Sequence, residues 1–197
     1  MINLKIRFSK LICVFISLYS INVFSDENKL IDIIEKNWND TQTVSGRFHQ
    51  GTNNDIISGN FYIQKPYKSN FTYDDGLKNI ITSKFFINIV DNKGYLIDRY
   101  PIINQHIYKL LSKEISFEET FEVLSIKTIN NEIIINLISK NNSHDNAAKI
   151  KLSFNEGDYS LKNWEIIDGL GQSTYLEFTN IRKNISIDPE LFTIKYN

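Results

Sequence analysis

The sequence predicts a mainly β protein with a few helices, in which one long antiparallel sheet is curved and covered by the helices. Three observations lead to this fold class. Apolar and polar residues alternate over most of the chain after Thr43, turn residues separate the alternating runs, and helical spacing occurs only near the start and in the middle. Turns that recur about every 8 to 12 residues are typical of an antiparallel meander and not of βαβ units.

Residues 1–25 have the features of a secretory signal peptide. Lys5, Arg7 and Lys10 form a basic start, residues 11–24 are largely apolar, and Ser25 is the small residue expected before a cleavage site. The alternative, an uncleaved membrane anchor, is disfavoured because the apolar run is short and interrupted. We therefore expect cleavage after Ser25, release to the periplasm and a mature protein of residues 26–197, a length suited to one domain.

The first element expected in the mature chain is a helix over residues 28–40. Its apolar residues are three and four positions apart and form a single stripe: Leu30, Ile33, Ile34 and Trp38. Strands follow from Thr43. The clearest alternating pairs are Phe61 and Ile63, Phe71 and Tyr73, Ile133 and Ile135, Ile150 and Leu152, Trp164 and Ile166, and Leu176 and Phe178.

Helical spacing returns once between these strands. Residues 103–111 place four apolar residues on one face: Ile103, Ile107, Leu110 and Leu111. Ser116 and Glu119 then form a capping-box pattern, which predicts a short helix through Leu124. A strongly curved sheet leaves a cavity that small helices can close, so we expect the helices 28–40 and 103–111 at its mouth.

Composition argues against several function classes. Without the three basic residues of the signal, 19 basic residues face 23 acidic ones, and the mature chain carries a net charge of about −4. This balance disfavours nucleic acid as a partner and electrostatic docking to anionic membranes. Cys13 is the single cysteine and lies within the signal, so the mature protein has neither a disulfide nor a thiolate metal site.

Enzymatic interpretations find little support in the sequence. His49, His106 and His144 are far apart, and none has a second ligand at a metal-like spacing. No serine lies in the G-x-S-x-G context of a nucleophile elbow, and the glycines at 169 and 171 are better explained as a hairpin turn than as a phosphate loop. We expect no catalytic residues, no metal and no cofactor.

Aromatic residues are concentrated in the first half of the predicted sheet, and most of them are expected to form the core. Phe61, Ile63, Phe71 and Tyr73 share one face of two neighbouring strands and are our candidates for the lining of an apolar ligand cavity. Alternation alone does not distinguish a filled interior from a cavity.

Four stretches resemble the LolA family of periplasmic lipoprotein carriers, in the family's order. Residues 44–50 resemble its first strand with a Phe-x-Gln pattern, and residues 59–66 match its glycine, apolar alternation, basic residue and proline. Residues 161–174 are similar to its D-x-x-G-x-x-T hairpin, and residues 180–192 resemble its last strand. Residues 98–101, followed by a short apolar helix, resemble the alphaproteobacterial branch.

The resemblance implies a half-open antiparallel barrel closed by a helical lid around a cavity for acyl chains. It also implies three partners: acylated lipoproteins, an inner-membrane ABC transporter that releases them, and an outer-membrane acceptor. The carrier is expected to be a periplasmic monomer. A lipid-sensing or other binding module of the same fold is the alternative, and a small enzyme with an apolar substrate is a weaker one.

The resemblance also gives the lid residues. We expect Ile107, Leu110 and Leu111 on the lid, and Lys65 in the position where the family usually has an arginine that bonds to the lid. Lysine lacks the planar fork of donors, so a looser latch is expected. Ser69 stands where many relatives have a bulkier residue. The identity of the lipoproteins, the number of acyl chains and the resting state of the lid are not encoded in these patterns.

Overall fold

The computed structural model describes residues 21–52, 55–102, 106–140, 148–167 and 171–196, and the side chains of residues 21–28, 52, 55, 106 and 107 are not described. The helices are α1 (Ile21–Asp40), α2 (His106–Leu110), α3 (Phe117–Thr120) and the 3-10 helix η2 (Pro189–Phe192). The strands are β1 (Thr43–Thr52), β2 (Asp55–Gln64), β3 (Lys68–Tyr73), β4 (Asn79–Thr82), β5 (Phe86–Val90), β6 (Leu96–Pro101), β7 (Phe121–Ile129), β8 (Glu132–Ser139), β9 (Lys149–Asn155), β10 (Leu161–Ile167) and β11 (Ser173–Lys183).

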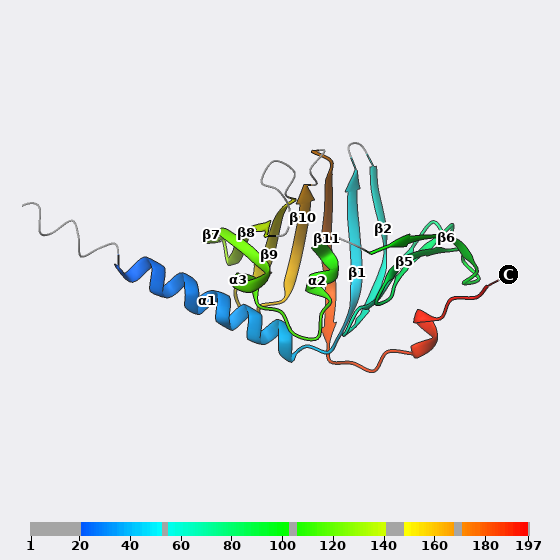
Figure 1. Ribbon diagram of the computed structural model, residues 1–197, viewed down its shortest axis with the longest axis horizontal. Helices are drawn as coiled ribbons and strands as arrows, with labels where there is room; N and C mark the ends of the chain where they lie inside the picture. The colour runs from blue at the N-terminus through cyan, green and yellow to red at the C-terminus, as the bar shows by residue number, and fades with distance from the viewer. Residues whose placement is uncertain (1–20, 53–54, 103–105, 141–147, 168–170, 197) are drawn as a thin grey trace, which may run out of the picture.

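All of the described strands belong to one curved, open sheet (Figure 1). Their order is β6-β5-β4-β3-β2-β1-β11-β10-β9-β8-β7, and the neighbours pair antiparallel. The first and last strands, β1 and β11, therefore meet at the centre, with one meander on each side. The predicted fold class, a mainly β protein with a curved antiparallel sheet, is confirmed.

The three α-helices cover one face of this sheet. Ile31 and Ile34 of α1 are 3% and 0% exposed and belong to one core cluster with Leu111 and the inward side chains of the strands. On β8, the alternate residues Ile133, Ile135 and Leu137 are all fully buried, as the period of two predicts. The core therefore lies between the helices and the inner face of the sheet.

Three helix boundaries differ from the prediction. α1 is already helical at Ile21, the first described residue and seven residues before the expected start. The described part of α2 is His106–Leu110, which ends one residue before the expected Leu111, and residues 103–105 lie outside the described part. The Ser116 hydroxyl accepts a hydrogen bond from the Glu119 amide, as a capping box requires, but α3 ends at Thr120. The prediction of helix through Leu124 was wrong, because Phe121 already pairs with Ser139 as the first residue of β7.

The segment after β11 crosses the opposite face of the sheet. Asn70 points away from the core, is 4% exposed, and its Nδ2 donates to the carbonyl oxygen of Leu191, 2.6 Å away. Further on, the Leu96 amide donates to the carbonyl of Lys195 at the edge strand β6. Residues 184–196, the C-terminal arm, thus cross from the centre of the sheet to β6, where the C-terminus lies in Figure 1.

Candidate functional site

The inner face of the sheet contains a cavity of about 360 Å³ between its centre and the β3–β5 wing. This volume falls in the range of small-molecule sites, about 300 to 1,000 Å³. Its apolar lining comes from six strands and from the chain that follows α2. The lining residues are Gln50, Ile63, Ser69, Phe71, Tyr73, Ile80, Thr82, Ile87, Leu111, Trp164, Ile166, Gln172, Thr174 and Leu176.

Strand register explains why the predicted aromatic residues gather here. β2 pairs with β3 so that Ile63 is opposite Ser69, Phe61 opposite Phe71 and Gly59 opposite Tyr73, all on the inner face. Gly59 is required in this row, because a Cβ there would lie 2.6 Å from the ring of Phe48. The Phe48 and Tyr73 rings instead meet edge to face with centroids 5.1 Å apart.

Seven of the eight residues predicted for the cavity and the lid have described side chains, and these occupy three environments. Ile63, Phe71, Tyr73 and Leu111 surround the cavity. Phe61 and Leu110 are 2% and 4% exposed and belong to the adjoining core. Lys65 follows β2 and contacts the last turn of α1. Ile107 is in α2, and its side chain is outside the described part.

Hydrogen bonds from the last turn of α1 hold residues 110–117 in place. The indole Nε1 of Trp38 donates to the carbonyl of Leu110, 2.9 Å away. Asn39 makes a pair of bonds with Ile115, each of 2.9 Å, as donor to its carbonyl and as acceptor from its amide. The Glu35 carboxylate accepts from the amide of Phe117. These residues attach the wall that contains Leu111 to α1.

The turn between β2 and β3 contacts the same wall from the other side. The Tyr67 amide donates to the carbonyl of Leu111 at 2.7 Å, and the ring of Tyr67 stacks on that of Tyr108 with centroids 4.5 Å apart. Residues 106–115, which we call the lid segment, are therefore held by hydrogen bonds from Trp38, Asn39 and Tyr67 to their backbone and by one ring pair.

Lys65 has a different partner from the one that we expected. Its side chain is 7% exposed, its Nζ donates to the carbonyl of Trp38, and Nζ lies 4.6 Å from the centre of the Trp38 ring. The expected acceptor was a carbonyl of the lid; in the structure the acceptor is a carbonyl of α1, one of the two helices expected at the mouth of the cavity. Burial lowers the pKa of Lys65 from 10.5 to about 8. Among the described hydrogen bonds, Lys65 is therefore linked to the lid segment through Trp38, whose Nε1 donates to Leu110.

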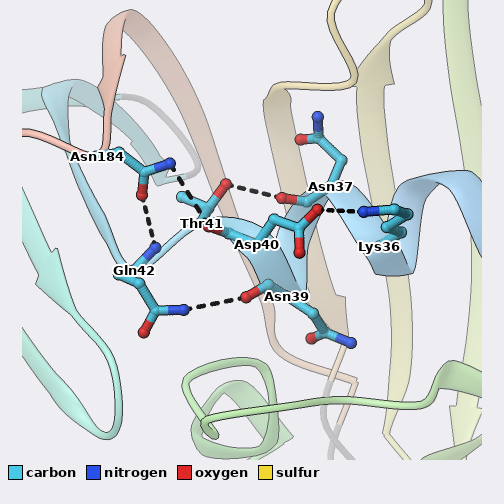
Figure 2. Close-up of polar contacts among 7 residues, drawn as sticks. All are labelled: Lys36, Asn37, Asn39, Asp40, Thr41, Gln42 and Asn184. Atoms are coloured by element: carbon cyan, nitrogen blue, oxygen red, sulfur yellow. Dashed lines mark hydrogen bonds and ion pairs between the residues drawn. The ribbon is translucent and has the colours of Figure 1, made fainter.

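The last turn of α1 is also tied to the C-terminal arm (Figure 2). Asn184 accepts a hydrogen bond from the Gln42 amide at 2.8 Å and donates to the carbonyl of Asp40 at 3.5 Å. The Thr41 hydroxyl closes the helix by donating to the carbonyl of Asn37. These bonds fix the direction of the turn that carries Trp38 and Asn39.

Several residues of the site were not singled out from the sequence. Trp164, Ile166 and Leu176 were recognised as alternating strand residues, and the same alternation places them on the inner face. Gln50 and Thr174 appeared in the sequence only as the last residues of the Phe-x-Gln and D-x-x-G-x-x-T patterns, since the inward position of a polar residue is visible only once the strand register is known.

Two findings on the described residues concern metal binding and membrane-spanning helices. They contain no group of three or more side chains of the types that hold metal ions. Among the helices of residues 21–52, 55–102, 106–140, 148–167 and 171–196, none is long and apolar enough to cross a membrane.

Several solved structures are similar to this chain. A conserved protein from Thermus thermophilus matches 86% of this chain and 98% of its own, with 10% identity and a TM-score of 0.48. A LolA superfamily protein from Nitrosomonas europaea matches 82% of this chain and 96% of its own, with 9% identity and a TM-score of 0.43.

Sequence comparison gives the more specific result. The chain is 30% identical over 138 residues to the outer-membrane lipoprotein carrier protein of Methylococcus capsulatus, and the match covers 68% of this chain and 65% of that carrier. The model of the family described as "Outer membrane lipoprotein carrier protein LolA" matches residues 39–195, from the last turn of α1 to the end of the C-terminal arm. The chain therefore belongs to the LolA family.

Proposed function

We propose that this protein carries acylated lipoproteins through the periplasm with their acyl chains in the cavity behind the lid segment. The observation that carries the proposal is the apolar cavity of about 360 Å³, which has Leu111 of the lid segment as one wall. The name of the Methylococcus capsulatus relative supports the same cargo. In this proposal an inner-membrane ABC transporter supplies the lipoprotein and an outer-membrane acceptor receives it.

Physical chemistry favours a cavity of this kind for a carrier. Each methylene of an acyl chain that is exposed to water costs about 0.8 kcal/mol, so a lipoprotein does not leave a membrane unaided. A carrier needs to match the bilayer only approximately, because a much tighter site would not release its cargo. An apolar wall that is attached by a few hydrogen bonds fits this requirement, since it can move without disturbing the sheet.

Native mass spectrometry of the mature protein with a triacylated lipoprotein tests the proposal. The wild type is expected to form a one-to-one complex. Ile87→Asp places a charge in the cavity wall and is expected to abolish the complex. Phe85→Asp is the matched control, because Phe85 is 62% exposed and lies two residues away. Equal loss in both variants, or equal retention, would count against the cavity.

A transfer assay separates the carrier from the alternative binding module. Loaded protein is mixed with vesicles that carry the outer-membrane acceptor, and the lipoprotein in the vesicles is measured. Transfer supports the carrier. A stable complex that transfers nothing would favour a lipid-sensing module of the same fold.

A further inference from the structure

One end of the cavity carries neutral hydrogen-bonding side chains among its apolar walls. Gln50 of β1 and Trp164 of β10 both lie opposite Leu176 of β11, so the three share one row across the inner face. Thr174 lies two residues before Leu176 and also lines the cavity. This row lies at the end of the cavity where two residues of its lining, Gln172 and Thr174, are exposed to solvent.

The orientation of Gln50 is fixed by Tyr73. The Tyr73 hydroxyl donates to Oε1 of Gln50 at 2.8 Å. Burial and the charge of Asp75 raise the pKa of Tyr73, so the phenol remains a donor at neutral pH. Oε1 is thus occupied, and the two donors of Nε2 have no acceptor among the described residues.

Trp164 supplies a second donor without a partner. Its side chain is 2% exposed and lines the cavity, and the indole Nε1 has no hydrogen-bond acceptor among the residues that the structure describes. Leaving a buried donor without an acceptor is unfavourable, and such groups in native proteins call for an explanation. A ligand with a carbonyl oxygen would provide the acceptor.

The opposite end of the cavity offers no such group. Ser69 and Thr82 both line it, but their hydroxyls bond to each other at 2.8 Å, and Thr82 is also bonded to the carbonyl of Tyr67. Ile63 and Leu111 provide the apolar surface there. Ile63 is four residues along β2 from Gly59, a separation of about 13 Å at the usual rise of a strand.

The lining excludes one large class of lipid heads. Among the described residues around the cavity there is no lysine, arginine, histidine, aspartate or glutamate. A phosphate group would therefore enter without a countercharge, which is strongly unfavourable in an apolar site. An ester or amide linkage is neutral and presents carbonyl oxygens to the two donors.

We propose that Gln50 and Trp164 bind the ester or amide carbonyls of a neutral acyl head, with the hydrocarbon chain directed toward Ile63 and Leu111. The inference rests on the proposed function and names the class of lipid linkage that the cavity selects. Tyr73 is a positioning residue, which acts by holding the Gln50 carboxamide with its donors free.

Binding of three probes distinguishes this assignment from a merely apolar cavity. The probes are a monoacylglycerol, a lysophosphatidic acid with the same chain, and pyrene, which has no hydrogen-bond acceptor. We expect the wild type to prefer the monoacylglycerol to the lysophosphatidic acid. Gln50→Leu and Trp164→Phe should each weaken monoacylglycerol binding about fivefold, the equivalent of one hydrogen bond of about 1 kcal/mol, and leave pyrene binding unchanged.

Gln42→Leu is the matched control, because Gln42 is exposed at the junction of α1 and β1, outside the cavity lining, and should change nothing. Equal binding of the two acyl probes, or an equal loss of pyrene and monoacylglycerol in the variants, would overturn the inference while the apolar cavity stands. If pyrene does not bind the wild type, the proposed function fails as well.

Discussion

At the scale of single residues, Trp38 connects Lys65 to the lid segment. Its backbone carbonyl and ring contact the Lys65 ammonium, and its indole Nε1 donates to Leu110. The sequence identified Lys65 by its place before Pro66, but its partner lies 27 residues earlier in the chain. No local pattern predicts such a pair, because the register of β2 against the end of α1 is set by packing.

The shifted pKa of Lys65 gives a pH prediction. The folded pKa is about 8 and the ordinary value is 10.5, so between these values the unfolded chain binds more protons than the folded one. The free energy of unfolding of the wild type should therefore rise with pH in this window relative to Lys65→Met, by up to about 1.4 kcal/mol per pH unit. Urea unfolding at several pH values measures the difference. Lys36→Met, at an exposed lysine, is the control, and parallel profiles for wild type and Lys65→Met would contradict the prediction.

At the scale of elements, alternation predicted the strands better than helical spacing predicted the helices. The period of two gave the inward residues of β2, β3, β8 and β10, since one face of each strand packs on the core. The extent of the short helices is determined by tertiary hydrogen bonds instead. The capping box before residues 121–124 predicts that they are helical. They belong to β7 instead, because pairing with β8 satisfies their backbone hydrogen-bonding groups.

The attachment of the lid segment to α1 is testable by hydrogen exchange. Asn39→Ala removes both bonds to Ile115, so amides of residues 110–117 should exchange roughly tenfold faster, as expected for the loss of about 1.4 kcal/mol of local stability. Amides of β8 should keep their protection. Lys36→Ala, on the same helix but exposed, should leave both regions unchanged, and uniform acceleration in Asn39→Ala would indicate global destabilisation instead.

At the scale of the whole molecule, the sheet has two halves that meet at β1 and β11. The meander β7 to β10 supplies the largest share of the buried residues in the core cluster that also contains Ile31 and Ile34 of α1, while β3 to β5 and the sheet centre surround the cavity. The fold class was predictable because it depends on repeated alternation along the chain. A cavity was expected from the curved sheet and from the family resemblance, but its lining was only partly identified, because alternation gives the inner face of the sheet and not the part of that face that the helices fill.

The last prediction concerns the start of the mature protein. The signal peptide of residues 1–25 remains a prediction, since residues 1–20 lie outside the described part and α1 runs through Ser25. The buried residues of α1, Ile31 and Ile34, and those that bond to residues 110–117, Glu35, Trp38 and Asn39, all follow Ser25, so a chain of residues 26–197 should keep these core contacts.

Two measurements check this prediction. N-terminal sequencing of the exported protein should begin at Asp26, and urea unfolding of residues 26–197 should match that of the full chain. Ile34→Ala in residues 26–197 should lower the free energy of unfolding by about 2 to 5 kcal/mol, because Ile34 is fully buried. Exported protein that begins at Met1 would contradict cleavage. A marked loss of stability on removing residues 1–25 would show that the N-terminal turns of α1 belong to the fold.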